Sequence, residues 1–121
     1  MTIVATSSMV MKSEEAAEKL AQEGIECEVI DLRTIVPLDT KTIIESVKKT
    51  GKLIVADEAH ERCGIGAEIA AAVADDIFYY LDAPCGRVNN PNVPLPFSPA
   101  LEFPLIPSAD KVYDKVKTYF K

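Results

Sequence analysis

The residues best suited to chemistry lie close together in segment 57–69, which reads DEAHERCGIGAEI. The segment holds the only histidine of the chain, His60, and a cysteine three residues later, Cys63. Three kinds of site could use these residues: a metal centre, a Cys–His nucleophile pair, or a phosphate-binding loop built on Gly64 and Gly66. Each kind of site requires further residues, which the rest of the sequence must supply.

The metal and nucleophile interpretations lack the additional residues that they need. A zinc site needs three or four ligands, and the other cysteines, Cys27 and Cys85, fall on or near other predicted strands with no histidine beside them. A Cys–His pair needs a third group that orients the base, and nothing else in the sequence supports one. His60 is therefore interpreted as a loop residue that either has a structural role or contacts a substrate, a cofactor or a neighbouring domain.

The glycines do not fit the dinucleotide-binding fingerprint. That motif needs a small residue three positions after the second glycine, where this chain has Ile69. Glu68 would also lie in the first turn of the following helix and repel a phosphate. The glycines are instead expected to let the chain turn sharply from a strand into a helix. Elsewhere, Asp31 and Arg33 could bind a ligand, but a local ion pair that shapes their loop is favoured.

Length, charge and cysteine content predict a single domain in a reducing compartment. The chain has 121 residues, of which 48% are hydrophobic and 26% charged, enough for one core. The net charge of -6, without a cluster of lysines and arginines, argues against nucleic acid or an anionic membrane as a partner. No apolar run approaches the ~20 residues that span a bilayer. Three widely spaced cysteines and no signal peptide predict a cytoplasmic location.

Predicted strands and helices alternate along the chain. Short apolar runs predict four strands: Thr2–Ala5, Ile25–Leu32, Leu53–Ala56 and Pro84–Val88. Helical spacing and end signals predict four helices: from Val10 to a stop at Gly24, from the cap Asp39 to Gly51, from Gly66 to Ile77, and from Ser108 onward. The alternation predicts an α/β fold, with a doubly wound, mainly parallel sheet covered by helices on both faces. If the first strand lies between the second and third, segment 57–69 lines the crevice at the switch point.

The segment Asp82–Pro107 breaks this alternation. It contains every proline of the chain except Pro37 and has little periodic structure. Irregular segments of this length are unusual inside compact domains and often have a function. Its apolar side chains are Val93, Leu95, Phe97, Leu101, Phe103 and Leu105. They predict an ordered, proline-stiffened arm on a single domain that spans 1–121. The arm would lie either on another chain or on its own sheet.

Five motifs in order resemble the C-terminal domain of transketolase-like thiamine diphosphate enzymes: VIDLRTIVPLD, LIVADEAHERCGIGAEIAAAV, LDAPCGRV, PNVPLPFSPALE and IPSADKV. The resemblance covers nearly the whole chain. It is strongest to the β subunit of the decarboxylase component of 2-oxoacid dehydrogenases, of the pyruvate, acetoin or branched-chain type. It implies a parent oxidoreductase that decarboxylates a 2-oxo acid and passes the acyl group to a lipoyl arm.

The resemblance further implies that this chain is a fragment or an excised domain that is inactive by itself. In the family, a pyrimidine-binding domain and an edge strand precede the position of Met1. Thiamine diphosphate and Mg²⁺ are held by a GDG…NN motif of the partner α subunit, and Asn89-Asn90 has no GDG before it here. The fragment is therefore expected to bind neither cofactor nor metal and to hold no catalytic residue. The loop with Glu58 and His60 would face the active-site entrance.

The implied partners are an α subunit and a second β subunit of a heterotetramer, and the subunit-binding domain of an acyltransferase core. A homodimer of this domain alone is left open. Carried over residue by residue, the subunit interface would contain Arg87, Pro94, Phe97, Leu101 and Glu102. Phe120 and Lys121 would lie at the core-binding region. The alternative hypothesis is a free-standing α/β domain that binds a small ligand in the switch-point crevice.

Overall fold

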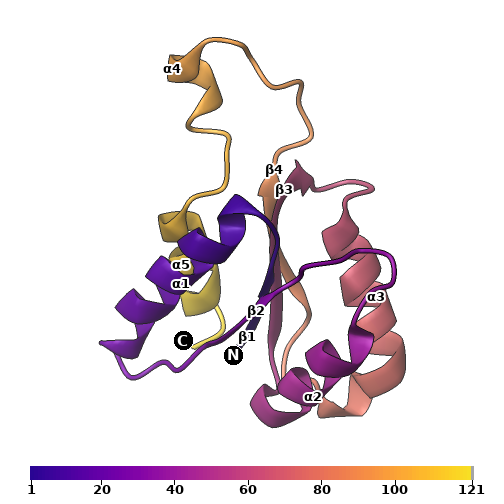
Figure 1. The fold of residues 1–121 in the computed structure, drawn as a ribbon. Coiled ribbons are helices and arrows are strands. Elements are labelled where there is room, and N and C mark those ends of the chain that lie inside the picture. The colour runs from indigo at the N-terminus through magenta and orange to yellow at the C-terminus, as the bar shows by residue number, and fades with distance from the viewer. Residues whose placement is uncertain (121) are drawn as a thin grey trace.

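The computed structural model describes residues 1–120 and contains one sheet of four parallel strands (Figure 1). The strands are β1 (Thr2–Ala5), β2 (Glu28–Asp31), β3 (Leu53–His60) and β4 (Gly86–Asn90). Their order across the sheet is β2-β1-β3-β4, with β1 pairing in parallel with both β2 and β3. This order confirms the predicted sheet and its switch point between the carboxyl ends of β1 and β3.

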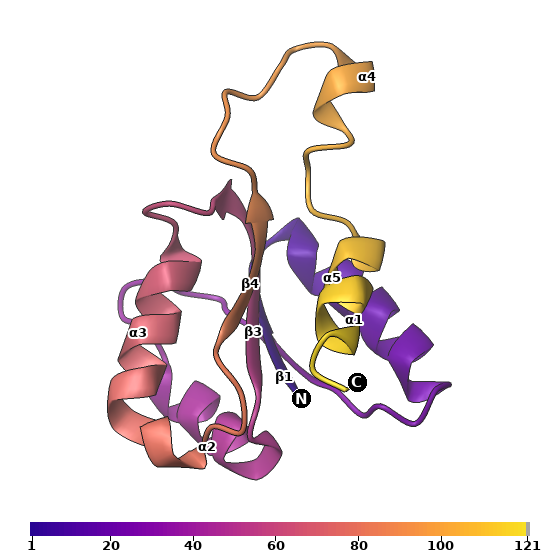
Figure 2. The same cartoon turned by 180° about the vertical axis from the view of Figure 1, so that it is seen from behind.

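Helices cover both faces of the sheet, as predicted (Figures 1 and 2). The pair α1 (Ser8–Ala21) and α5 (Ala109–Lys117) lies on one face, and the pair α2 (Thr40–Thr50) and α3 (Ile65–Ile77) lies on the other. A short 3₁₀ helix, η1 (Phe78–Tyr80), follows α3, and the single turn α4 (Pro99–Glu102) lies far from the sheet. None of the helices in residues 1–120 has the length and apolar character needed to cross a membrane.

Alternate residues of the central strands face two separate apolar cores. The core beneath α1 and α5 is built on Ile3, Ala5, Ile54 and Ala56, with Met9, Leu20, Val112 and Val116 from the helices. The core beneath α2 and α3 is built on Val4, Leu53 and Val55, with Ile43, Val47, Ile69 and Val73. Strands covered on both faces need apolar residues at every position, which explains the continuous runs TIVA and LIVA.

The helix ends follow the predicted signals. Asp39 caps α2, because its Oδ1 accepts a hydrogen bond from the Thr42 amide at 3.1 Å. Gly51 ends the same helix in the left-handed conformation, with φ of 71°, and its N–H donates to the Val47 carbonyl at 2.7 Å. At the start of α5, Ser108 accepts from the Lys111 amide at 3.3 Å. These caps fix where α2 and α5 begin relative to the sheet.

Two strands differ in extent from the predictions. β3 was expected to end near Asp57, but it continues to His60, with a register shift after Ala56 and a final pair between His60 and Asn90 of β4. The first part of segment 57–69 is therefore strand. β2 is shorter than the predicted Ile25–Leu32, because the Ile25 amide donates to the Leu20 carbonyl and so belongs to the turn that ends α1.

The proline-rich segment contains β4 and then leaves the domain. Residues 91–106, called the arm from here on, project beyond the carboxyl edge of the sheet and return to α5 (Figures 1 and 2). The part of segment 82–107 before Pro91 is not arm, because Gly86–Asn90 pairs with β3.

Candidate functional site: the strand ends and the arm

The turn between β3 and α3 gets its shape from close packing. Cys63 adopts the left-handed conformation, with φ of 58°, whereas Gly64 has φ of -78°. A Cβ atom at Gly64 would lie 2.5 Å from the His60 carbonyl oxygen, and one at Gly66 would lie 3.0 Å from Oδ2 of Asp57. The glycines do allow the sharp turn, but the reason is the close approach of other atoms rather than a positive φ.

The side chain of Asp57, a residue of β3, lies against the first turn of α3. It is buried, with 2% of the residue exposed, and its Oδ1 accepts a hydrogen bond from the Ala59 amide at 2.6 Å. Its Oδ2 points toward Gly66 in the first turn of the helix and has no hydrogen-bond partner within residues 1–120. A carboxylate at this end is stabilised by the helix dipole, and its charge excludes a phosphate from the same place.

His60 and Arg62 hold the outgoing end of the arm. Nε2 of His60 lies 3.1 Å from the Val93 carbonyl oxygen, and the Arg62 amide donates to Oδ1 of Asn92 at 2.9 Å. The chain's one histidine thus contacts the arm's backbone. Among the residues that the structure describes, no group of three His, Cys, Asp or Glu side chains is placed to hold a metal ion.

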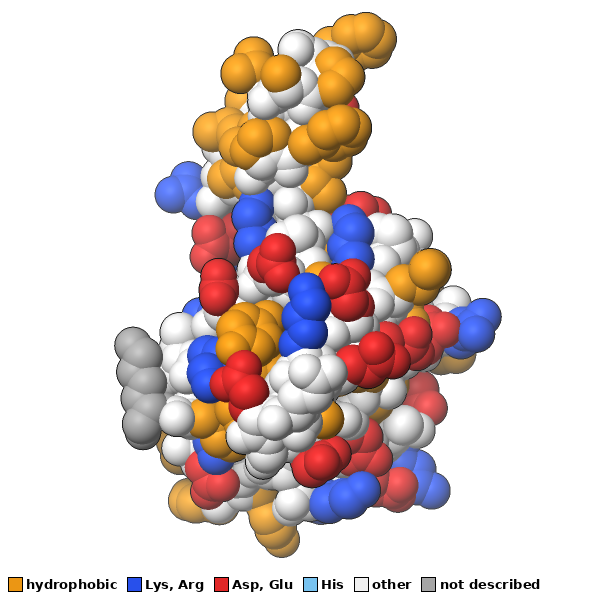
Figure 3. Space-filling view, turned by 90° about the vertical axis from the view of Figure 1, so that its left-hand side faces the viewer, with side chains coloured by type: hydrophobic (Ala, Val, Ile, Leu, Met, Phe, Trp, Pro, Cys, Tyr) orange, Lys and Arg blue, Asp and Glu red, His pale blue; other side chains and the backbone are white. Residues whose placement is uncertain are grey.

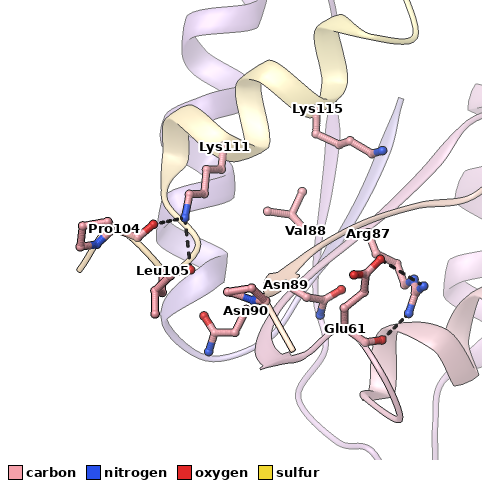
Figure 4. Close-up of a pocket in the computed structure, with 10 residues that line it drawn as sticks. Glu61, Arg87, Val88, Asn89, Asn90, Pro104, Leu105, Lys111 and Lys115 are labelled. Atoms are coloured by element: carbon pink, nitrogen blue, oxygen red, sulfur yellow. Dashed lines mark hydrogen bonds and ion pairs between the residues drawn. The ribbon is translucent and has the colours of Figure 1, made fainter. Parts of the chain in front are cut away.

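Arg87 and Asn90 tie the strand ends together directly below the arm (Figure 4). Nη1 of Arg87 donates to the Glu61 carbonyl at 2.6 Å, and Nη2 lies 3.7 Å from the Glu61 carboxylate. Nδ2 of Asn90 donates to the Glu58 carbonyl at 2.6 Å. Of the predicted site residues, the structure therefore brings Glu58, His60 and Arg87 together at the base of the arm.

Two lysines hold the returning end of the arm. Nζ of Lys111 donates to the carbonyl oxygens of residues 104, 105 and 106 at 2.6, 3.2 and 3.1 Å (Figure 4). Nζ of Lys12 donates to the Pro107 carbonyl at 2.9 Å and lies 3.5 Å from the Glu58 carboxylate. Lys12 and Lys111 could not be identified from residue types, because their acceptors are backbone carbonyls that no side-chain pattern marks.

Ion pairs join α5 to α1 and to the turn that follows α1. Nζ of Lys117 donates to Glu23 at 2.5 Å, and the Tyr113 hydroxyl donates to the same carboxylate. The hydrogen bond from Lys117 lowers the pKa of Glu23, and the carboxylate in turn raises the pKa of Lys117 and of Tyr113. Lys19 adds a second pair, with Asp110 at 3.1 Å.

Between its two anchored ends, the arm exposes large apolar side chains (Figure 3). Phe97 is fully exposed at 102%, and the other exposed side chains are Val93, Leu95, Leu101 and Phe103. Pro94 is also exposed, and Glu102 is half-buried. This exposure contradicts the interpretation in which the arm lies on its own sheet. An ordered, unburied apolar surface of this kind is typical of a protein–protein contact.

The opposite end of the domain carries a second apolar surface. Phe78, Tyr79 and Tyr80 of η1 are all exposed, and Tyr79 is 96% exposed. Lys48 lies over the Tyr80 ring at 5.2 Å and Lys52 over the Phe120 ring at 4.9 Å, so both rings border the α2–β3 turn. Phe120 is 41% exposed. The other predicted core-binding residue, Lys121, lies outside the described residues.

A pocket near the carboxyl end of β2, on the other side of β1 from the switch point, offers a small ligand few unpaired polar groups. The pocket is open and is lined by Ser7, Val10, Met11 and residues 31–33. Its two charged groups are paired with each other, since Nε of Arg33 lies 2.6 Å from Oδ2 of Asp31. This distance confirms the predicted local ion pair.

The comparisons with known proteins agree with the fold. The family model described as "Transketolase, C-terminal domain" matches residues 1–112. The chain is 50% identical over 116 residues to the pyruvate dehydrogenase E1 component subunit beta of Rickettsia felis, covering 96% of this chain and 36% of that protein. It is 50% identical over 111 residues to the acetoin:2,6-dichlorophenolindophenol oxidoreductase subunit beta of Cupriavidus necator, covering 92% and 33%.

A solved structure is similar over the same range. It is described as a split gene transketolase, inactive beta4 tetramer, and it matches with a TM-score of 0.80 and 31% identity. The match covers 97% of this chain and 37% of that one. The chain thus spans about a third of the length of the curated relatives it matches.

Proposed function

Because the chain belongs to the family of transketolase C-terminal domains, we propose that it is the C-terminal assembly domain of the beta subunit of a 2-oxoacid dehydrogenase decarboxylase component. The relatives named as pyruvate dehydrogenase and acetoin oxidoreductase beta subunits support this assignment. The parent enzyme would use thiamine diphosphate and Mg²⁺ to decarboxylate a 2-oxo acid and would transfer the acyl group to a lipoyl group.

The start of α3 does not fit the diphosphate group of thiamine diphosphate. The first turn of α3 is the start of a helix at a strand end with nearby glycines, the usual place for a diphosphate. Here the Asp57 carboxylate already fills it, with Oδ2 3.0 Å from the position of a Cβ at Gly66. We therefore assign assembly to this domain, and no step of the chemistry.

The observation that carries the proposal is the anchored apolar arm. Both of its ends are hydrogen-bonded to the domain, by His60 at one end and Lys111 at the other. Its prolines limit the backbone conformations between these ends, so ordering the arm in a complex costs little further entropy. The proposed subunit interface is centred on Pro94, Phe97 and Leu101 at the projecting part, with Glu102 beside them and Arg87 at the base.

A second surface is proposed for the acyltransferase core. Phe120, together with the exposed aromatic residues of η1, would bind the subunit-binding domain of the core. The support is that the Tyr80 and Phe120 rings both lie near the α2–β3 turn, where Lys48 and Lys52 contact them, at the end of the domain opposite the arm. The arm and the η1 surface would then serve different partners without competing for space.

A cytoplasmic location belongs to the same proposal. It is supported by Cys27, Cys63 and Cys85, which are all free thiols. Burial raises the pKa of the Cys27 and Cys85 thiols, which keeps them protonated and unreactive near neutral pH.

Co-expression of the full-length subunit with its cognate α subunit tests the proposed function. We expect a heterotetramer by light scattering. We also expect dichlorophenolindophenol reduction that requires both subunits, thiamine diphosphate and Mg²⁺, with pyruvate, acetoin and branched-chain 2-oxo acids tested in turn. If the two subunits elute separately and no 2-oxo acid or acetoin is oxidised, the proposal is wrong.

A further inference from the structure

A pocket lies between β4, α5 and the two ends of the arm (Figure 4). Its volume is about 420 Å³, within the range of sites that hold small molecules. The apolar part of its lining comes from β4 and from both ends of the arm: Val88, Pro91, Pro104 and Leu105. A molecule in this pocket would therefore touch the outgoing and the returning end of the arm at once.

The charged part of the lining is mainly positive, although the whole chain has a net charge of -6. Three cationic side chains, Arg87, Lys111 and Lys115, border the pocket, and the one carboxylate among its lining residues is Glu61. A concave site with an excess of one charge concentrates small ions of the opposite charge. The pocket therefore favours an anion.

Lys115 is the cation of this pocket that lacks an acceptor. Lys111 already donates to the carbonyl oxygens of residues 104–106, and Arg87 donates to the Glu61 carbonyl with the Glu61 carboxylate at 3.7 Å. Figure 4 shows Lys115 turned away from the arm carbonyls that hold Lys111. Within residues 1–120 its ammonium group forms no hydrogen bond or ion pair, and it lies 5.8 Å from the centre of the Tyr119 ring.

The lining also indicates which kind of anion fits. Lys115 is half-buried, so a hydrogen bond between its ammonium group and a carboxylate would be partly shielded from water. One free cation near the Glu61 carboxylate suits a single negative charge better than the double charge of a phosphate. The apolar residues of β4 and the arm suit an alkyl chain.

We propose that this pocket binds a short, branched aliphatic carboxylate, with its carboxylate on Lys115 and its alkyl chain against Val88 and the two arm ends. Because Pro91 and Pro104 belong to opposite ends of the arm, the bound acid joins these ends and makes the arm more rigid. A more rigid arm loses less entropy on assembly, so the acid promotes binding of the α subunit. This last step rests on the proposed function, whereas the binding of the acid does not.

Saturation-transfer NMR on the full-length subunit without its α subunit tests the binding. We expect 3-methylbutanoate to bind with a Kd of about 1 mM, a usual affinity for a ligand of so few atoms. Acetate should bind about tenfold more weakly, because it lacks the alkyl chain. Inorganic phosphate and 3-methylbutylamine should not bind. 3-Methyl-2-oxobutanoate has the same carboxylate and chain; binding of either acid supports the site, and the tighter of the two identifies the acid that the pocket prefers.

Lys115→Met removes the charge that the carboxylate needs and keeps an unbranched side chain of similar length. We expect it to weaken binding of 3-methylbutanoate about tenfold or more. Lys41→Met is the matched control, because it makes the same change in charge at an exposed lysine of α2, on the other face of the sheet. It should leave binding unchanged, and thermal unfolding of both variants checks that they are folded.

Hydrogen exchange tests the effect on the arm. Amides of residues 92–103 should exchange more slowly when 3-methylbutanoate is added, and Lys115→Met should remove this protection. Failure of both acids to bind, equal binding by Lys115→Met, or equal binding of phosphate would overturn the inference. Binding without any change in arm exchange would overturn the proposed effect on the arm. Assembly with the α subunit in the absence of acid is measured separately, so its failure would contradict the proposed function and not the binding site.

Discussion

Phe97→Asp is expected to weaken binding of the full-length subunit to its α subunit by about 2 kcal/mol or more, or about thirtyfold, the loss typical of a central aromatic contact. The fold should be unaffected, because the Phe97 side chain is fully exposed in the chain alone. Isothermal titration calorimetry measures the affinity, and thermal unfolding of each variant checks that the melting temperature is unchanged.

Tyr79→Asp is the matched control for Phe97→Asp, since Tyr79 is also an almost fully exposed aromatic residue but lies at the opposite end. We expect Tyr79→Asp to leave α-subunit binding intact and to reduce binding to the subunit-binding domain of the core. The reverse pattern, or equal loss in both variants, would contradict the separate assignment of the two surfaces.

Gly64→Ala is expected to lower the free energy of unfolding by about 2–3 kcal/mol, as overpacking against a rigid neighbour does. The new methyl group would lie 2.5 Å from the His60 carbonyl oxygen, so the strand end or the helix start must shift. Because His60 contacts the Val93 carbonyl, the shift should also loosen the outgoing end of the arm. Urea unfolding measures the first effect, and hydrogen exchange of the arm measures the second.

Gly24→Ala measures the cost of backbone strain at a glycine where an added methyl group makes no close contact. Gly24 has φ of 80° and nothing within 4 Å of an added Cβ, so only the left-handed conformation opposes alanine there, at about 1 kcal/mol. The arm should exchange as in the unmodified protein. If Gly24→Ala destabilises as much as Gly64→Ala, the packing explanation of the β3–α3 turn is wrong.

The sheet could be predicted because its signals are local and redundant. The continuous apolar runs of β1 and β3 indicated strands buried on both faces, and Asp39 and Gly51 marked the ends of α2. Asp31 and Arg33 lie two residues apart, so their ion pair required only local geometry. Each of these predictions depended on residues close together in the chain.

The predictions that failed concerned features that depend on tertiary packing. The predicted helix from Val10 begins earlier, as α1 starts at Ser8 and buries Met9 together with Ser13, Ala16 and Leu20. The large Met9 side chain fills the core beneath α1 and α5, so packing extends the helix beyond its predicted start. In the same way, β3 extends to His60 because β4 offers Asn90 as a partner, which no pattern within β3 indicates.

The arm's existence was predicted, but the contacts that anchor it were not. Proline content and apolar residues indicate an ordered segment, whatever the rest of the domain contacts. The lysines at its returning end bind main-chain carbonyls, and Asn92 accepts from the Arg62 amide. Such contacts depend on where the backbone lies after folding, so residue types alone do not reveal them.

Hydrogen exchange of the arm, with and without the α subunit, tests the assembly role most directly. The full-length subunit is measured alone and in the assembled enzyme, and the amides of Val93, Leu95, Phe97 and Leu101 are followed. We predict strong protection of these amides on assembly, with the η1 residues 78–80 unchanged until the core's subunit-binding domain is added. Equal exchange of the arm in the free and assembled subunit would contradict its role as the interface.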